Sequence, residues 1–258
     1  MFIKRVFLTL FIVLVFFSSL FTKVNAQSWY FKKNGNNQPE LKNDLKIIEK
    51  YEVYWCDEKH TSIFDDDKVI YLTFDAGYEN GNIEKILDVL KAENVQGNFF
   101  ILENLILKNK DLVGRMINEG HTIANHTATH KDMTKLNSIE DFKSELCRLE
   151  KTFEDAFGQK MEKYYRPPEG KFNEKNLAWA TELGYKTVFW SFAYEDWKNN
   201  DQKNCQESLE KIINNLHNGE VILLHPTSAT NASIMKELIQ YLKNEGFRFG
   251  DLNELCQG

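Results

Sequence analysis

Short apolar runs alternate with longer amphipathic segments from residue 69 to the C-terminus. Runs rich in β-branched and aromatic residues, which favour buried strands, cover 69–75, 97–102, 122–126, 163–166, 187–193, 221–225 and, more weakly, 247–251. Between them apolar residues recur with helical spacing at 83–93, 110–119, 139–157, 174–183, 206–218 and 233–244. Glycines, which readily adopt the left-handed conformation that ends a helix, follow five of these segments: Gly120, Gly158, Gly184, Gly219 and Gly246. The alternation predicts repeated βα units and a parallel sheet.

Seven parallel strands in one domain predict an α/β fold, a distorted (β/α) barrel with helices around the sheet. An open, doubly wound sheet is the alternative. Such sheets usually carry a glycine-rich first turn that binds phosphate, whereas the turn at 75–81 fits neither GxGxxG nor a phosphate loop. We expect the barrel to span 68–252, after an irregular, aromatic-rich N-terminal wrap at 27–67 and before a short tail at 253–258.

Residues 1–26 have the layout of a secretory signal peptide. Lys4 and Arg5 precede an apolar stretch at 6–21, and Val24-Asn25-Ala26 offers the small residues of a cleavage site. An uncleaved membrane anchor is the alternative, because the apolar stretch approaches the length of a bilayer span. Both interpretations place the rest of the chain outside the cytoplasmic membrane, either secreted or membrane-tethered.

The charge of the chain bears on its partners. Removing the leader cations Lys4, Arg5 and Lys23 takes the formal charge from −6 to −9, because the leader holds no acidic residue. An acidic domain lacks the basic face that nucleic acid requires, and it is poorly suited to anionic lipid. We therefore expect a partner that is recognised by shape and hydrogen bonds. The sequence does not determine the oligomeric state.

Four cysteines occur, at Cys56, Cys147, Cys205 and Cys256. None lies in a CxxC pair, so a thiolate zinc site is not expected. Export permits disulfides, and four cysteines allow three pairings. Buried free thiols are the equal alternative, and the sequence leaves the choice open.

Ionisable residues end five of the predicted strands, at the side of a barrel where active sites gather. They are Asp75, His126 together with His130, Arg166, Asp196 and His225. Because the carboxyl ends of parallel strands meet at one face, we expect these side chains to converge. This convergence is the main indication of chemistry that the residues give by themselves.

The spacing of His126 and His130 brings two imidazoles to one side of a turn, where both can bind one divalent ion. A surface histidine pair is the alternative. Asp75 offers a general base, or merely a turn residue that caps the next helix. Arg166 precedes Pro167 and is therefore held extended. Its guanidinium suits a carboxylate such as Asp75, although a surface arginine on a proline turn is also compatible with the pattern.

The predicted strand at 221–225 is apolar except for its last residue, His225. Asp196 offers the carboxylate that would orient this imidazole and raise its pKa, as a general acid requires. A buried structural histidine is the alternative for His225.

Five short motifs occur in a fixed order along the chain. They are Thr73-Phe74-Asp75-Ala76-Gly77, His126-x-x-x-His130, Arg166-Pro167-Pro168-Glu169-Gly170, Asp196-Trp197 and Leu223-Leu224-His225. In type and order they resemble the motifs of the polysaccharide deacetylases, carbohydrate esterase family four, which are distorted (β/α) barrels. The resemblance covers roughly 69–252. Further segments are most similar to the δ-lactam-forming muramic acid de-N-acetylases of spore formers: Tyr78-Glu79-Asn80-Gly81, Phe189-Trp190-Ser191 and Trp29-x-Phe31.

The resemblance implies a role for each residue at the strand ends. Asp75 would be the base that acts on metal-bound water, with Arg166 as its brace. His126 and His130 would be metal ligands. His225 would be the acid that protonates the leaving amine, tuned by Asp196.

The resemblance also implies three substrate-binding positions. The backbone N–H after Pro168, which belongs to Glu169, would help to hold the oxyanion. Trp197 and Leu223 would line the pocket for the acetyl group.

One position departs from the family pattern. Ala76 stands where the family usually has a second aspartate that binds the metal, and alanine cannot be a ligand. The ion, for which zinc is the expected identity, would complete its shell with water, substrate, Asp75 or Asn80. Loss of a carboxylate should weaken the affinity and the selectivity for zinc.

The implied activity is hydrolysis of the acetamide of N-acetylmuramic acid in peptide-free peptidoglycan strands, which leads to muramic δ-lactam in spore cortex. A cell-wall amidase would act earlier in the pathway, and the enzyme would face the cell wall. The alternatives are the same chemistry on N-acetylglucosamine in peptidoglycan, on chitin or on acetylated xylan, and a catalytically inactive glycan-binding homologue in which Ala76 marks the loss. A serine esterase is disfavoured because no GxSxG motif occurs.

Overall fold

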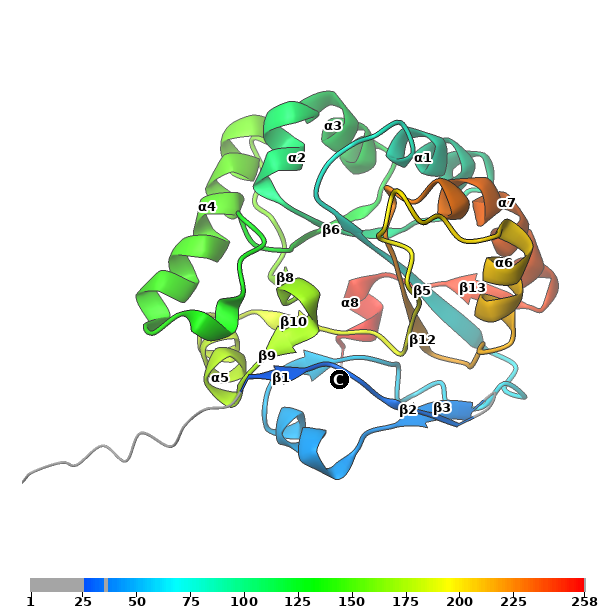
Figure 1. Ribbon diagram of the computed structural model, residues 1–258, viewed down its shortest axis with the longest axis horizontal. Helices are drawn as coiled ribbons and strands as arrows, with labels where there is room; N and C mark the ends of the chain where they lie inside the picture. The colour runs from blue at the N-terminus through cyan, green and yellow to red at the C-terminus, as the bar shows by residue number, and fades with distance from the viewer. Residues whose placement is uncertain (1–25, 35–36, 258) are drawn as a thin grey trace, which may run out of the picture.

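The computed structural model describes residues 26–34 and 37–257, and in it helices surround one curved parallel sheet (Figure 1). The described strands of the main sheet follow the order β11 (Phe192–Ala193), β12 (Glu220–Leu224), β5 (Lys68–Ala76), β6 (Asn98–Ile101), β7 (Thr122–Asn125), β8 (Tyr164–Tyr165), β10 (Lys186–Val188) and β4 (Val53–Tyr54). A further strand, β13 (Phe247–Phe249), pairs with the start of β5. The predicted distorted α/β barrel is confirmed, as a sheet curled into a half-barrel.

Strand β5 is the centre of the sheet. One edge of β5 pairs with β12. On the other edge β13 pairs with its first residues and β6 with its last ones, from Thr73 to Ala76. Because neighbours cover both faces and both edges, the strand is a nearly continuous apolar run, as central parallel strands are. Asp75, near its end, is the exception and lies where the sheet opens to solvent.

The single strand predicted at 187–193 is wrong. The segment forms two short strands, β10 and β11, which lie at different places in the strand order. The residues between them leave one edge and join the other: the Phe189 N–H donates to the Tyr54 carbonyl at 2.8 Å, and the Ser191 N–H donates to the Val221 carbonyl at 3.0 Å. The chain itself therefore spans the gap between the two ends of the curled sheet.

The N-terminal wrap is more regular than predicted. It contains strand β1 (Gln27–Ser28), the hairpin of β2 (Lys32–Asn34) and β3 (Asn37–Glu40), a 3-10 helix at Asn43–Lys50, and β4, which extends the main sheet. Figure 1 shows this segment in blue along one side of the sheet. The aromatic ring of Trp29 stacks on Phe189 with centroids 4.4 Å apart, and Cys56 forms an antiparallel bridge with Glu220. The wrap thus covers the gap in the half-barrel.

Six helices occur where they were predicted: α1 (Ile83–Ala92), α3 (Lys110–Asn118), α4 (Ile139–Phe157), α5 (Glu174–Glu182), α6 (Cys205–Ile213) and α7 (Ala229–Asn244). Two of them have bounds that differ from the prediction by more than one residue. Helix α6 ends at Ile213 rather than at 218, because the residues after it turn inward and Asn218 donates to the Asp67 carbonyl at 2.9 Å. Helix α7 begins before 233, because the Ser228 hydroxyl caps it by accepting from the Asn231 N–H at 3.2 Å.

Two short helices, α2 (Glu103–Lys108) and α8 (Leu252–Leu255), were not predicted, because segments of so few residues show no helical periodicity. Short strand β9 (Lys171–Phe172) also escaped prediction and pairs with β1. Helix α8 and the buried Cys256 show that the predicted tail at 253–258 begins as part of the packed core.

All four cysteines are free thiols, so the structure shows no disulfide among them. Cys56 and Cys256 are buried, and burial raises the pKa of the Cys256 thiol to about 12. No helix in the described part of the chain is long and apolar enough to cross a membrane. The predicted leader at 1–26 lies outside the described residues except for Ala26.

The prediction that Gly219 ends a helix is wrong. Helix α6 ends earlier, at Ile213, and Gly219 lies in the turn that leads directly into β12. Its φ is +75°, in the left-handed region. A Cβ atom there would lie 2.5 Å from the Asp57 carbonyl oxygen and 2.7 Å from that of His60. The Asp57 N–H also donates to the Gly219 carbonyl at 2.8 Å. The wrap therefore packs directly against backbone that only glycine can provide.

We predict that Gly219→Ala destabilises the protein more than Gly158→Ala does. Gly158 is the matched control: its φ is +68°, but no atom lies within 4 Å of an added Cβ. The control variant should lose about 1 kcal/mol of unfolding free energy from backbone strain alone. Gly219→Ala should lose about 2 kcal/mol more, because backbone oxygens cannot move away cheaply. Urea denaturation measures both, and equal losses would contradict the packing argument.

Candidate active site

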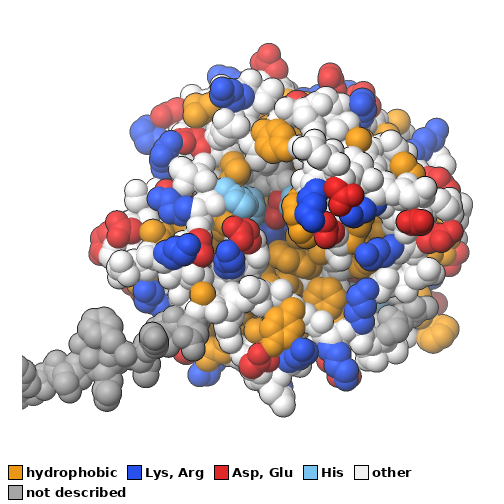
Figure 2. All heavy atoms as spheres, in the orientation of Figure 1, with side chains coloured by type: hydrophobic (Ala, Val, Ile, Leu, Met, Phe, Trp, Pro, Cys, Tyr) orange, Lys and Arg blue, Asp and Glu red, His pale blue; other side chains and the backbone are white. Residues whose placement is uncertain are grey.

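A cleft of about 840 Å³ opens at the carboxyl ends of the strands. Figure 2 shows histidine and hydrophobic side chains gathered around a hollow near the centre of the visible face. The residues that line the cleft are Asp75, His130, Glu169, Gly170, Trp190, Ala193, Tyr194, Glu195, Trp197, Leu223 and His225. Six of the nine site residues predicted from the sequence are among them. The other three, His126, Arg166 and Asp196, are buried behind this lining.

The Arg166 side chain is fully buried and makes a hydrogen bond from every nitrogen of its guanidinium. Nη1 donates to Asp75 Oδ1 and to Thr73 Oγ1, both at 2.9 Å. Nε donates to the Val188 carbonyl and Nη2 to the Phe189 carbonyl, both at 3.0 Å. These bonds join β5 to the end of β10. The orientation of the Asp75 carboxylate is therefore fixed by a group that is itself held on three sides.

The surroundings of Asp75 favour its ionised form. Burial by itself raises the pKa of this carboxyl, but attraction to His126, which is protonated only in acid, and to the permanent charge of Arg166 outweighs burial and lowers the pKa below its usual range. The carboxylate is thus negatively charged at neutral pH. A buried charge that is paired and faces a cleft can accept a proton from a molecule bound there.

His126 lies against Asp75, whereas His130 lies at the rim. The His126 Nδ1 is 2.9 Å from the Arg166 carbonyl oxygen, and its Nε2 is 3.5 Å from Asp75 Oδ2. The centroids of the two imidazole rings are 5.0 Å apart. Burial lowers the pKa of His126 to about 4, so the ring is neutral at pH 7. Since Nδ1 donates to the carbonyl, Nε2 carries the free lone pair that a metal ligand needs.

The loop that carries His130 has an unusual backbone. Thr127 has φ +75° and His130 has φ +57°, which side chains other than glycine rarely adopt. The Thr127 hydroxyl accepts from the His130 N–H at 2.9 Å, and the buried Glu145 carboxylate accepts from the Thr129 hydroxyl at 2.9 Å. These bonds hold a strained loop in the shape that places His130 at the cleft.

The donor set is suited to a divalent ion, but it is incomplete. Two imidazoles and a nearby carboxylate are ligands that zinc and similar ions accept. Asp75 already pairs with Arg166, and Ala76 is buried and offers no ligand atom. Asn80 donates through Nδ2 to the Thr227 carbonyl at 2.8 Å. The residues therefore fit an ion held mainly by His126 and His130.

A tighter cluster of possible ligands lies at the opposite end of the sheet. In the described part of the chain, only Asp57, His60 and Glu254 bring three ligand atoms within 4.8 Å of one another. These groups already have partners: His60 Nδ1 is 2.8 Å from Asp57 Oδ2, and Arg248 Nη1 donates to Glu254 Oε2 at 2.8 Å. The cluster is an ion-pair network that fastens the wrap to the C-terminal segment.

His225 is paired with Asp196 as the sequence predicted. The ring Nδ1 is 2.7 Å from Asp196 Oδ1, and the backbone N–H of His225 donates to Asp196 Oδ2 at 2.8 Å. Burial lowers the pKa of His225, but the hydrogen bond and charge of Asp196 outweigh burial and raise the pKa above its usual value. The half-exposed indole of Trp197 lies edge-on to the imidazole, with centroids 5.7 Å apart. The imidazolium is therefore stabilised at the cleft wall.

The remaining predicted positions lie on the cleft wall and rim. Leu223 is buried near the end of β12 and lines the cleft. Glu169 has φ +57°, between Pro168 and Gly170. Its side chain is exposed and pairs with Lys171 at 2.6 Å. At the rim of the cleft, the backbone of Glu169 is therefore held in a defined conformation, whereas its carboxylate points to solvent.

Comparison with known proteins agrees with this geometry. Residues 64–188 match the family model described as polysaccharide deacetylase. The chain is 37% identical over 230 residues to the peptidoglycan-N-acetylmuramic acid deacetylase PdaA of Bacillus subtilis, covering 88% of this chain and 85% of that protein. It is 33% identical over 192 residues to a peptidoglycan-N-acetylglucosamine deacetylase of Bacillus cereus, covering 73% and 68%. This chain belongs to the polysaccharide deacetylase family.

The solved structure of Bacillus subtilis PdaA, a family 4 carbohydrate esterase, superposes with a TM-score of 0.82 and 36% identity, covering 89% of this chain and 96% of that one. The likeness thus extends over most of this polysaccharide deacetylase.

Sequence reasoning gave no role to two buried residues of this deacetylase site. Thr73 accepts from Arg166 and donates to the Ile222 carbonyl at 2.7 Å, and so it ties the guanidinium to β12. Asn231, on α7, donates to Asp196 Oδ2 at 2.6 Å. Thr73 lies in the first motif, and its alternation with Asp75 along β5 could have indicated it. Asn231 has no local signal, because only the tertiary fold brings α7 to Asp196.

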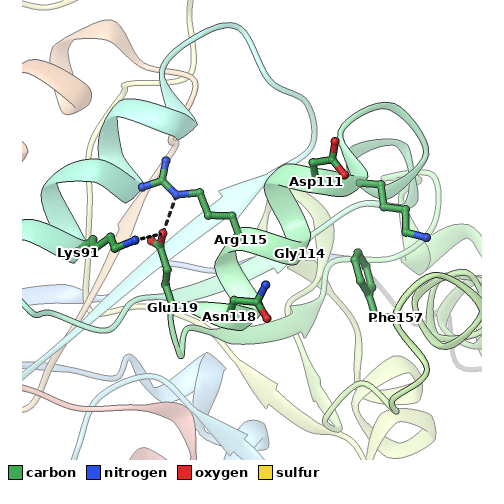
Figure 3. Close-up of a pocket in the computed structure, with 8 residues that line it drawn as sticks. Lys91, Asp111, Gly114, Arg115, Asn118, Glu119 and Phe157 are labelled. Carbon is green, nitrogen blue, oxygen red and sulfur yellow. Dashed lines mark hydrogen bonds and ion pairs between the residues drawn. The ribbon is translucent and has the colours of Figure 1, made fainter.

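A second hollow lies on the outer surface of the deacetylase, between α1, α3 and the end of α4 (Figure 3). Glu119 pairs there with Arg115 at 2.7 Å and with Lys91 at 3.4 Å. None of the residues predicted for catalysis lines it. Glu119 is thus engaged by two cations, and we interpret the hollow as a surface depression.

We predict that Arg166→Met lowers the unfolding free energy by about 3–5 kcal/mol at neutral pH, because it leaves the buried Asp75 charge uncompensated. The loss should shrink as the pH falls, since burial without the arginine raises the pKa of Asp75 and protonation removes the charge. Adding Asp75→Asn to the variant should recover part of the loss. Denaturation at pH 7 and pH 4 measures this. A loss that neither acid nor the second substitution reduces would contradict the ion-pair explanation.

Proposed function

We propose that this protein hydrolyses the acetamide of N-acetylmuramic acid in peptide-free peptidoglycan strands. The observation that carries the proposal is that two pKa values are shifted in opposite directions in one cleft: the pKa of the Asp75 carboxyl is lowered, and the pKa of the His225 imidazole is raised. Amide hydrolysis needs both a base for water and an acid for the amine. The likeness to PdaA supports the muramic acid substrate.

Asp75 acts as the base. Its carboxylate accepts a proton from the attacking water as the water oxygen bonds to the acetyl carbon. Arg166 holds the carboxylate in place and keeps it ionised until that moment. A divalent ion bound by His126 and His130 would supply polarisation of the acetyl carbonyl. The backbone N–H of Glu169 is positioned by its left-handed φ as a candidate donor to the oxyanion.

His225 acts as the acid. Because Asp196 accepts from Nδ1–H, the proton that reaches the substrate comes from Nε2. It passes to the amine nitrogen as the carbon–nitrogen bond breaks, which releases acetate and a free amino sugar. Trp197 and Leu223 line the cleft and provide apolar surface for the acetyl methyl group of the substrate. The freed amine can close on the lactyl carboxyl group and give muramic δ-lactam, as in spore cortex.

The surroundings of the substrate set the place of the reaction. Peptidoglycan lies outside the cytoplasmic membrane, so the predicted leader at 1–26 would deliver the enzyme to it, either released or tethered. Strands without stem peptides are produced by amidase cleavage. An amidase therefore precedes this enzyme in the pathway.

The same chemistry on N-acetylglucosamine is the second candidate, favoured by the likeness to the Bacillus cereus N-acetylglucosamine deacetylase. A glycan-binding protein without turnover is the third, favoured by Ala76 at the position of the missing ligand. The second candidate differs from the proposal in its substrate, and the third differs in having no turnover. Separate measurements therefore distinguish them.

Acetate release from peptide-free glycan strands, intact peptidoglycan and chitin oligomers tests the substrate. We expect the peptide-free strands to react fastest. Asp75→Asn and His225→Ala should each lower the rate on the order of a hundredfold or more, because each removes a proton-transfer group. Asp66→Asn, which changes an exposed carboxylate, is the matched control and should keep the rate. Preference for chitin would overturn the muramic acid assignment.

Turnover after chelation, with and without added zinc or other divalent ions, tests the binding-only alternative. Recovery of acetate release on addition of an ion supports the proposed use of His126 and His130. If no ion restores turnover while labelled strands still bind, the protein is a glycan-binding homologue.

We predict that the alkaline limb of the kcat–pH profile depends on Asp196. Asp196 raises the pKa of His225, and a general acid works only while it is protonated, so activity should fall as the pH rises through that pKa. Asp196→Asn removes the negative charge that stabilises the imidazolium. Its alkaline limb should therefore move to lower pH, while the acidic limb set by Asp75 stays in place. An unmoved alkaline limb would show that His225 is not the acid.

A further inference from the structure

The Asp196 carboxylate accepts a hydrogen bond from Asn231 in addition to those from His225. Oδ1 faces the ring Nδ1 of His225 at 2.7 Å. Oδ2 accepts two N–H groups, from the His225 backbone at 2.8 Å and from the Asn231 side chain at 2.6 Å. The Asp196 side chain is only 1% exposed, so water cannot replace a missing donor. The plane of the carboxylate is therefore set by Asn231 together with the backbone.

The Asn231 amide has only one possible orientation. Its Nδ2 faces two acceptors, Asp196 Oδ2 and the His225 carbonyl, the latter at 3.1 Å. Its Oδ1 accepts from the Tyr194 hydroxyl. A flipped amide would place an oxygen against the carboxylate and the carbonyl, and would leave the tyrosine hydroxyl facing an N–H group. Each hydrogen of the amide nitrogen thus has a partner in the catalytic pair.

The backbone of Asn231 is fixed as firmly as its side chain. The residue is fully buried in the first turn of α7. Its N–H donates to Ser228 Oγ at 3.2 Å, which is the capping bond of the helix. The amino end of a helix also favours a nearby negative charge such as that of Asp196. A long, packed helix therefore delivers the amide to the carboxylate.

We propose that Asn231 is a positioning residue, whose amide holds the Asp196 carboxylate in the orientation that bonds to the His225 ring. The inference rests on the proposed role of His225 as the acid. With the amide in place, Oδ1 remains directed at Nδ1, the ring keeps its proton there, and Nε2 stays directed at the leaving amine. Without it, the carboxylate can turn about its Cβ–Cγ bond and the pair loses its alignment.

Two variants of Asn231 test the role. Asn231→Ala removes the amide. Asn231→Asp keeps its size and replaces the N–H donor by an acceptor, so it breaks the bond without leaving a cavity. Both should lower kcat by about tenfold or more, because the acid is misaligned, and should change KM little. NMR titration should show the His225 pKa in Asn231→Ala below that of the unchanged protein. The signal of His225 is identified by its absence from His225→Ala.

Asn98→Ala is the matched control for the loss of a buried amide. Asn98 is also buried, and donates to the Leu72 carbonyl at 3.0 Å and to the Gly250 carbonyl at 3.3 Å, away from the cleft. This control should lose stability but keep the kcat and the His225 titration. If Asn231→Asp folds and keeps the kcat and pH profile of the unchanged protein, the positioning role is refuted.

The titration also separates this inference from the proposed function. It follows the imidazole directly and needs no turnover. If the unchanged protein released no acetate, the function would fail, and the titration of His225 in Asn231→Ala would still decide whether the amide aligns the pair. An unaltered titration in that variant, with normal turnover in the unchanged protein, would overturn the inference alone.

Discussion

The buried guanidinium of Arg166 is the contact on which the geometry of the site depends. A charge that is fully removed from water must be paired and fully hydrogen-bonded, and Asp75, Thr73 and two strand-end carbonyls meet that demand. These partners come from β5 and from the end of β10, so the same bonds also hold those two strands together. The carbonyl of Arg166 in turn fixes the His126 ring. One buried charge thus organises both Asp75, the proposed base, and His126, the nearer of the two proposed metal ligands.

The two carboxylates of the site, Asp75 and Asp196, are involved in pKa shifts of opposite direction. Asp75 lies beside a permanent cation, which lowers its pKa and leaves it free to accept a proton. Asp196 lies beside an imidazole, whose pKa it raises so that a proton is available to give. Asp75 and the imidazole that Asp196 tunes, that of His225, line the same cleft. Chemistry that needs a base and an acid at the same pH follows from this difference in partners, and not from any difference in residue type.

The curled sheet needs help to hold this arrangement. Its two ends are not paired with each other among the described strands, and the chain between β10 and β11 crosses the opening. The wrap covers it from outside, with Trp29 on Phe189 and the Trp29 indole N–H donating to the Trp190 carbonyl at 2.8 Å. Phe189 also receives a bond from Arg166. Packing of the wrap and the orientation of Asp75 are therefore coupled through one short segment.

The sequence by itself determined what depends on local pattern: the alternation of strands and helices, the long buried β5, and the ionisable residues at strand ends, since side-chain periodicity and strand direction are local properties. It could not give the split of 187–193, the pairing of β4, or the role of Asn231. Each of these depends on which distant segments meet, and that is decided by packing around the gap in the sheet. Tertiary structure alone brings the first turn of α7 to Asp196, because no spacing along the chain encodes that contact.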